Sequence, residues 1–95
     1  MKIIMYTKDK CPNCERAKFM LNYSPIPVEL EIRNIESGKD AEKHENTLKN
    51  IIKSNSLPTL MVHNKLGTFE EEGDYYEALI GFDDNLGRLQ EVLGL

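Results

Sequence analysis

The 95-residue chain has no tryptophan, only two cysteines and no long run of apolar residues. A small secreted domain held by disulfides would carry more cysteines at wider spacing, and a membrane-spanning helix needs about 18 consecutive apolar residues. Six glycines and four prolines are too few for a collagen-like or low-complexity chain. These absences leave the class of small globular proteins, and we expect one domain over residues 1–95 with a modest core.

The chain also lacks an excess of basic residues, since 12 lysines and arginines stand against 16 acidic residues and the net charge is −4. Binding to nucleic acid requires a basic face, so this charge argues against nucleic acid as the main partner. The apolar run within residues 1–6 is too short for a signal peptide, and no segment predicts contact with a membrane. We therefore expect a cytoplasmic protein, in whose reducing environment a lone pair of close cysteines serves redox chemistry or metal binding.

Hydrophobic periodicity predicts alternating strands and helices. Strands are expected over residues 2–6, 28–34, 60–63 and 78–80, and helices over residues 12–22, 40–54 and about 83–93. A helix between the first two strands requires parallel pairing through a right-handed crossover, whereas the last two strands are joined too tightly for a crossover and should be antiparallel. The predicted fold is α/β, a mixed four-stranded sheet in the order β-α-β-α-β-β-α with helices on both faces.

Three local features complete the predicted fold. The acidic cluster within residues 68–76 is interpreted as a solvated loop or ribbon rather than a flap that selects partners. One of the two aspartates Asp83 and Asp84 should cap the last helix. The side chains of Phe19 and Met20 on the first helix are assigned to the core.

The residues that carry chemistry are Cys11-Pro12-Asn13-Cys14, between the first predicted strand and the first predicted helix. A helix N-terminus presents unpaired N–H groups and a partial positive charge, which stabilise a thiolate. We expect Cys11 to be exposed at this cap, with Lys8 and Lys10 adding positive potential, and to be a nucleophile with a lowered pKa. Cys14, one turn further, should be more buried and able to attack a mixed disulfide on Cys11.

The alternative for this pair is a metal site or two inert thiols. Zinc needs about four ligands, and the only other candidates are His44 and His63, with no second close pair of cysteines. A lone Cys-x-x-Cys in a βαβ context favours redox chemistry, so we expect no metal site.

Three segments resemble the bacterial and phage glutaredoxins, in the thioredoxin-fold superfamily. The segment Tyr6-Thr7-Lys8-Asp9-Lys10-Cys11-Pro12-Asn13-Cys14-Glu15-Arg16-Ala17-Lys18 resembles their active-site segment. Leu57-Pro58-Thr59-Leu60 and Gly81-Phe82-Asp83-Asp84 fit two later motifs of the family. With the order of the elements, the resemblance covers nearly the whole chain and implies a thioredoxin-like fold.

The resemblance also implies a set of substrate-binding residues, namely Lys8, Asn13, Leu57, Pro58, Gly81, Phe82, Asp83 and Asp84. Pro58 would be a cis proline facing the cysteines, with the backbone of Leu57 free to pair with an incoming peptide. The start of the last helix would hold the γ-glutamyl end of glutathione, with backbone N–H groups on its carboxylate and an aspartate on its ammonium group. Lys8 would meet the glycyl carboxylate.

Several positions depart from the family pattern. Asn13 stands where many glutaredoxins carry an aromatic residue, and Ile80-Gly81 replaces the usual paired glycines. The stretch 64–76 is longer than the usual tight hairpin. Phe82 is interpreted either as cover for the rim of the active site or as packing beneath the last helix.

The activity implied is that of a monomeric dithiol glutaredoxin, which reduces protein disulfides or glutathione mixed disulfides through Cys11. Glutathione would restore the dithiol without a bound cofactor, and the family suggests ribonucleotide reductase as a client. The location would be the cytoplasm, or the host cytoplasm if a phage encodes the chain. The nearest alternative is a similar redoxin recycled by thioredoxin reductase as an electron donor to ribonucleotide reductase. More distant alternatives are a module that binds an iron–sulfur cluster and a structural zinc module.

Overall fold

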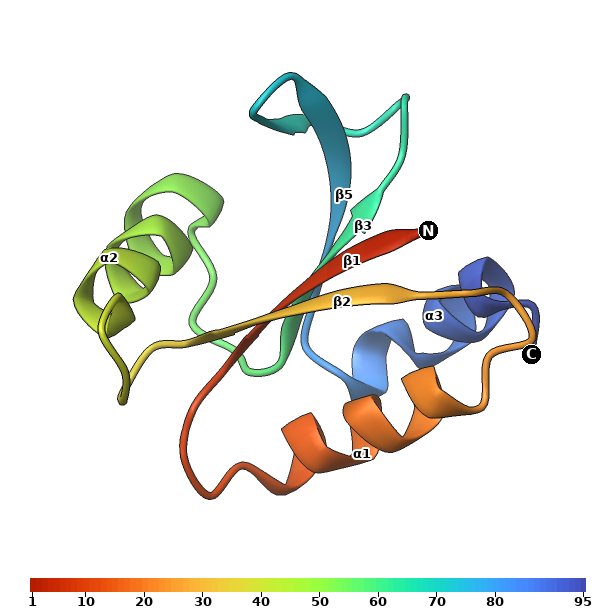
Figure 1. Ribbon diagram of the computed structural model, residues 1–95, viewed down its shortest axis with the longest axis horizontal. Coiled ribbons are helices and arrows are strands. Elements are labelled where there is room, and N and C mark those ends of the chain that lie inside the picture. Colours follow the sequence, from red (N-terminus) through yellow and green to blue (C-terminus); the bar gives the residue numbers. More distant parts are fainter.

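The sheet of the computed structural model, which describes residues 1–95, has five strands in the order β2-β1-β3-β5-β4 (Figure 1). Its strands are β1 (Lys2–Thr7), β2 (Glu29–Asn34), β3 (Thr59–His63), β4 (Phe69–Glu71) and β5 (Asp74–Ile80). Its helices are α1 (Pro12–Asn22), α2 (Ala41–Asn46) with a π-helical continuation (Thr47–Ile52), and α3 (Leu86–Leu93) after a 3-10 turn (Asp83–Asn85). β1 pairs with β2 in parallel, and the other three pairings are antiparallel. The predicted fold class is confirmed, with one strand more than expected.

The core forms two layers, one on each face of the sheet. Alternate residues of the buried strand β1 supply them, with Ile3 and Met5 on one face and Ile4 and Tyr6 on the other. Figure 1 shows α1 and α3 together on the first face and α2 on the second. Because β1 is buried on both faces, the position of its carboxyl end is well defined. The residues that follow β1 in the chain therefore start from a fixed place in the fold.

The acidic stretch 68–76 is a β-hairpin, which is the ribbon rather than the loop of the two forms expected from the sequence. β4 pairs with the start of β5 from Phe69 to Glu71, and the two strands are joined by Glu72 and Gly73. Both turn residues have positive φ angles, 52° and 86°. This is the backbone of a two-residue hairpin turn, which needs a glycine or another tolerant residue. In the sequence, the glycine at position 73 was the feature that could have predicted this hairpin.

An ion pair fixes the hairpin across the α2 face of the sheet. The guanidinium of Arg33, on the edge strand β2, donates to both carboxylate oxygens of Glu71, on the opposite edge strand β4. Arg33 also donates to Glu31 at 2.6 Å and to the Tyr6 hydroxyl at 2.8 Å, and its side chain is only 13% exposed. Hydrogen bonds from Arg33 lower the pKa of both carboxyl groups, whereas burial raises the pKa of Tyr6.

Replacing Glu71 tests this ion pair. The Glu71 side chain is 36% exposed, so the ion pair is neither fully buried nor fully on the surface. Glu71→Gln should therefore lower the free energy of unfolding at pH 7 by about 1–2 kcal/mol, between the losses typical of surface ion pairs and of buried ion pairs. Because Arg33 holds the pKa of Glu71 below the ordinary 4.5, this stabilisation is complete above pH 4.5 and is lost as the pH falls through the lowered pKa. Urea unfolding at pH 7 and in the acid range measures both effects.

The matched control is Glu70→Gln, because Glu70 neighbours Glu71 on the same strand and is exposed. It should leave the free energy of unfolding nearly unchanged at both pH values. Equal losses in the two variants would mean that the carboxylate of Glu71 contributes no specific stability.

Candidate active site

Cys11 is the N-cap of α1, as the sequence predicts. Its backbone is extended (φ −111°, ψ 100°), its Sγ accepts a hydrogen bond from the backbone N–H of Cys14 at 3.2 Å, and Pro12 fills the first helical position. Proline suits that position because its missing N–H would have no partner within the helix. The sulfur therefore takes the place that a capping oxygen holds in other helices.

The turn between β1 and Cys11 is held in place by Asp9. Its carboxylate accepts hydrogen bonds, both at 3.0 Å, from the side chains of Asn34, the last residue of β2, and Ser37, just after it. Its backbone N–H donates to Glu36 at 3.1 Å. Lys10, the residue before the cysteine, has a left-handed backbone with φ 53°. The sequence reasoning gave Asp9 no role, because its partners lie more than 20 residues further along the chain.

Cys11 and Cys14 form a disulfide, with their Cα atoms 5.2 Å apart. In this oxidised form Cys11 is 7% exposed and Cys14 is 1% exposed. The expectation of an exposed Cys11 was therefore wrong here, where its sulfur is bonded to Cys14 and accepts the hydrogen bond from the Cys14 N–H. Cys11 is the more accessible of the two residues, which is the order expected of a nucleophile and its resolving partner.

Six of the eight predicted substrate-binding residues line one pocket of about 250 Å³. They are Asn13, Leu57, Gly81, Phe82, Asp83 and Asp84, and Ser56 completes the wall. Lys8 is exposed and Pro58 is buried, and neither lines this pocket. Residues from three distant parts of the chain thus meet beside the redox motif, while their individual roles stay predictions.

Two backbone features shape this pocket. The Leu57–Pro58 bond is cis, the isomer that the resemblance implies, and the Pro58 carbonyl accepts a hydrogen bond from the Gly81 N–H at 3.3 Å. Gly81 has φ 89°, a conformation that residues with side chains rarely adopt. A glycine at this position therefore lets the chain leave β5 and turn toward the redox motif.

The two aspartates do not cap α3, so that prediction was wrong. They lie in a 3-10 turn, and the N-cap of α3 is Asn85, two residues later than expected for Asp83. The amide of Asn85 instead donates to the carbonyl groups of Ile80 and Gly81, at 2.7 and 3.0 Å. The Asp83 carboxylate pairs with Arg16 at 3.5 Å.

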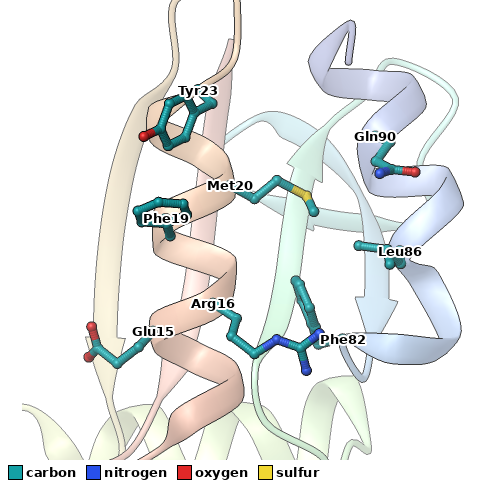
Figure 2. A pocket seen from close by; sticks show the side chains of 8 residues that line it. All are labelled: Glu15, Arg16, Phe19, Met20, Tyr23, Phe82, Leu86 and Gln90. Carbon is teal, nitrogen blue, oxygen red and sulfur yellow. The ribbon is translucent and has the colours of Figure 1, made fainter.

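Arg16 is a site residue that the sequence reasoning missed. Its guanidinium donates to the Asn13 side chain at 3.0 Å, and its central carbon lies 4.9 Å from the centre of the Phe82 ring. With the pair to Asp83, it touches three of the residues that line the pocket. Figure 2 shows it reaching from α1 toward Phe82. The sequence feature that could have identified Arg16 is its position three residues after Asn13, because residues three apart on a helix lie side by side.

The two histidines lie away from the cysteines. His44 on α2 meets the Tyr6 ring edge-on, and His63 on β3 meets the Tyr76 ring and lies 3.3 Å from Asp74. No group of three or more histidine, cysteine or acidic side chains is arranged to hold a metal ion. None of the helices has the length and apolar character needed to cross a membrane.

A thioredoxin-like fold with a Cys-x-x-Cys disulfide at the start of its first helix defines a class of small redox domains. Within that class, the model of the glutaredoxin family matches residues 3–66, more than half of the chain. The chain therefore belongs to the glutaredoxin family, and the predicted family is confirmed.

The chain is also similar to a solved structure, the crystal structure of the thioredoxin-like protein BC3987, with 26% sequence identity and a TM-score of 0.63. The match covers 92% of this chain and 97% of that one. No curated protein matches the chain. The family and the Cys11–Cys14 pair fit a thiol–disulfide oxidoreductase that acts on disulfide substrates.

The capping role of Cys11 can be measured as stability under reducing conditions. Cys11→Ala removes the acceptor for the Cys14 N–H and should cost about 1 kcal/mol in the free energy of unfolding relative to the reduced wild type. Cys11→Ser supplies a capping hydroxyl and should stay within a few tenths of a kcal/mol of the wild type. Equal stabilities of the alanine and serine variants would show that the side chain at position 11 does not cap α1.

Proposed function

We propose that this protein is a dithiol glutaredoxin that uses glutathione to reduce disulfides in client proteins or in glutathione mixed disulfides. The observation that carries the proposal is the pocket beside Asn13, where Leu57, Phe82 and Asp83 converge next to the redox cysteines. An acidic turn beside a thiol suits a thiol substrate that carries an ammonium group.

The reaction proceeds by two thiol–disulfide exchanges. The Cys11 thiolate attacks one sulfur of the client disulfide, which forms a Cys11–client disulfide and releases the other client sulfur as a thiolate that takes a proton from water. The Cys14 thiolate then attacks the Cys11 sulfur, forms the Cys11–Cys14 disulfide and releases the second client thiol. The client gains two electrons and two protons, and the protein loses two electrons.

Two molecules of glutathione return those electrons. The thiolate of the first attacks the Cys11 sulfur and releases Cys14, leaving a mixed disulfide on Cys11. The thiolate of the second attacks the glutathione sulfur of that mixed disulfide, which yields glutathione disulfide and the Cys11 thiolate. In this scheme Asp83 and Asp84 attract the ammonium group of the first glutathione, Lys8 attracts its glycyl carboxylate, and the cycle needs no bound cofactor.

A redoxin recycled by thioredoxin reductase is the second candidate. Asn13 favours this second candidate. Many glutaredoxins carry an aromatic residue at this position as one wall of the glutathione groove, whereas the Asn13 side chain here is hydrogen-bonded to Arg16. For either reductant we propose a cytoplasmic monomer whose clients include ribonucleotide reductase, as the family suggests.

A comparison of the two reductants tests the proposal. With 2-hydroxyethyl disulfide as substrate, the protein should turn over when glutathione, glutathione reductase and NADPH are supplied, and should show little turnover with thioredoxin reductase and NADPH. Cys11→Ser should abolish turnover because it removes the attacking sulfur. Full activity of that variant, or recycling by thioredoxin reductase in preference to glutathione, would refute the glutathione assignment.

Asp83→Asn adds a more local test within the same assay. Loss of the carboxylate should lower kcat/KM for glutathione about tenfold, roughly the effect of one charge-assisted hydrogen bond. The control is Asp40→Asn, since Asp40 is exposed and lies just before α2. Equal effects of the two substitutions would exclude a specific role for Asp83.

A further inference from the structure

An apolar groove of about 650 Å³ lies between α1 and α3 (Figure 2). Phe19 and Met20 of α1, with Tyr23 just after it, form one side, and Phe82 and Leu86 belong to the other. Phe19 is 64% exposed and Tyr23 is 65% exposed, so the expectation of a core position for Phe19 was wrong. Their rings lie 4.9 Å apart and form an apolar surface on the helix that bears both cysteines. Such a surface is typical of a site of interaction.

The groove is continuous with the pocket at the redox motif. Phe82 lines both cavities, and Arg16 lies at the boundary between them, since it covers the Phe82 ring and binds Asn13. The two charged residues that line the groove are both paired, Arg16 with Asp83 and Glu15 with Lys18. The groove therefore begins at the pocket beside Asn13 of the redox motif, and its surface favours uncharged side chains.

We propose that this groove binds an extended segment of the client protein, with apolar side chains four to six residues away from the cysteine captured by Cys11. The inference rests on the proposed function, because a client disulfide must reach Cys11. Phe19 and Tyr23 lie eight and twelve residues beyond Cys11, or about 12 and 18 Å along the helix. An extended peptide covers these distances in about four to six residues.

A second copy of the chain is a poorer occupant. A partner seated in the groove would lie over Phe82, which also lines the pocket, and would cover the rim that a substrate must cross. A client segment covers the same rim only while its own sulfur is reacting. The groove thus selects clients by the apolar residues near their cysteine, and it leaves small disulfides unaffected.

The test uses protein reduced beforehand, so that it does not depend on glutathione. Three ten-residue peptides carry one cysteine as a mixed disulfide with thionitrobenzoate. Two have a pair of leucines four and six residues from the cysteine, on the N-terminal or the C-terminal side, and the third has serines instead. Attack of Cys11 on the peptide sulfur releases coloured thionitrobenzoate, and attack of Cys14 on the Cys11 sulfur then releases the peptide thiol. The second-order rate constant for release of thionitrobenzoate is measured for each peptide.

One of the two leucine peptides should react about tenfold faster than the serine peptide, because its leucines become buried in the groove. The double variant Phe19→Ser/Tyr23→Ser should reduce this advantage to less than about twofold, while Leu66→Ser should preserve it. Leu66 is a matched control because it is 91% exposed and lies outside the groove. Every variant should reduce 2-hydroxyethyl disulfide at the wild-type rate, which also shows that it is folded.

The inference is overturned if neither leucine peptide is preferred, or if the preference survives in the double variant. It is also overturned if the wild type is a dimer at the assay concentration and the double variant is a monomer, since the occupant would then be a second copy. Failure of the proposed function has a different signature, namely loss of recycling by glutathione with the peptide preference intact.

Discussion

The hydrogen bond from the Cys14 N–H to the Cys11 sulfur is the interaction on which the site depends. It makes the sulfur the cap of α1 and holds it against the positive end of the helix, where unpaired N–H groups stabilise an anion. The sulfur stays there because β1 is buried on both faces and Asp9 ties the connecting turn to the end of β2. Redox chemistry at Cys11 is therefore a consequence of how the first strand and helix are joined.

The surroundings of this sulfur are built from distant parts of the chain. The cis bond before Pro58 and the left-handed Gly81 bring the β3 entry and the start of the last helix beside Asn13. Arg16 then links Asn13, Phe82 and Asp83 on the surface. One small domain thus offers two adjoining surfaces beside the redox motif, a polar pocket that we propose for a small thiol and an apolar groove that we propose for a client segment.

The parts of the fold that depend on local pattern were predictable from the sequence. Strand β1, helix α1 and the capping position of Cys11 follow from an apolar run, a proline and a Cys-x-x-Cys. The features that depend on contacts between distant residues were not. The pair of Arg33 and Glu71 joins residues 38 positions apart, and it turns an acidic stretch that is typical of a loop into an ordered hairpin. The exposure of Phe19, in contrast, agrees with helical periodicity, because Phe19 lies two residues from both Ala17 and Leu21 and so opposite the buried side of α1.

The ionisation of Cys11 tests the central claim most directly. The thiol would be titrated by its absorbance as a thiolate in reduced Cys14→Ser protein, so that only one cysteine responds. If the start of α1 stabilises the anion, the pKa of Cys11 lies below about 7.5, more than a unit below the value of about 8.5 for a free cysteine. A pKa of about 8.5 or above would contradict the account.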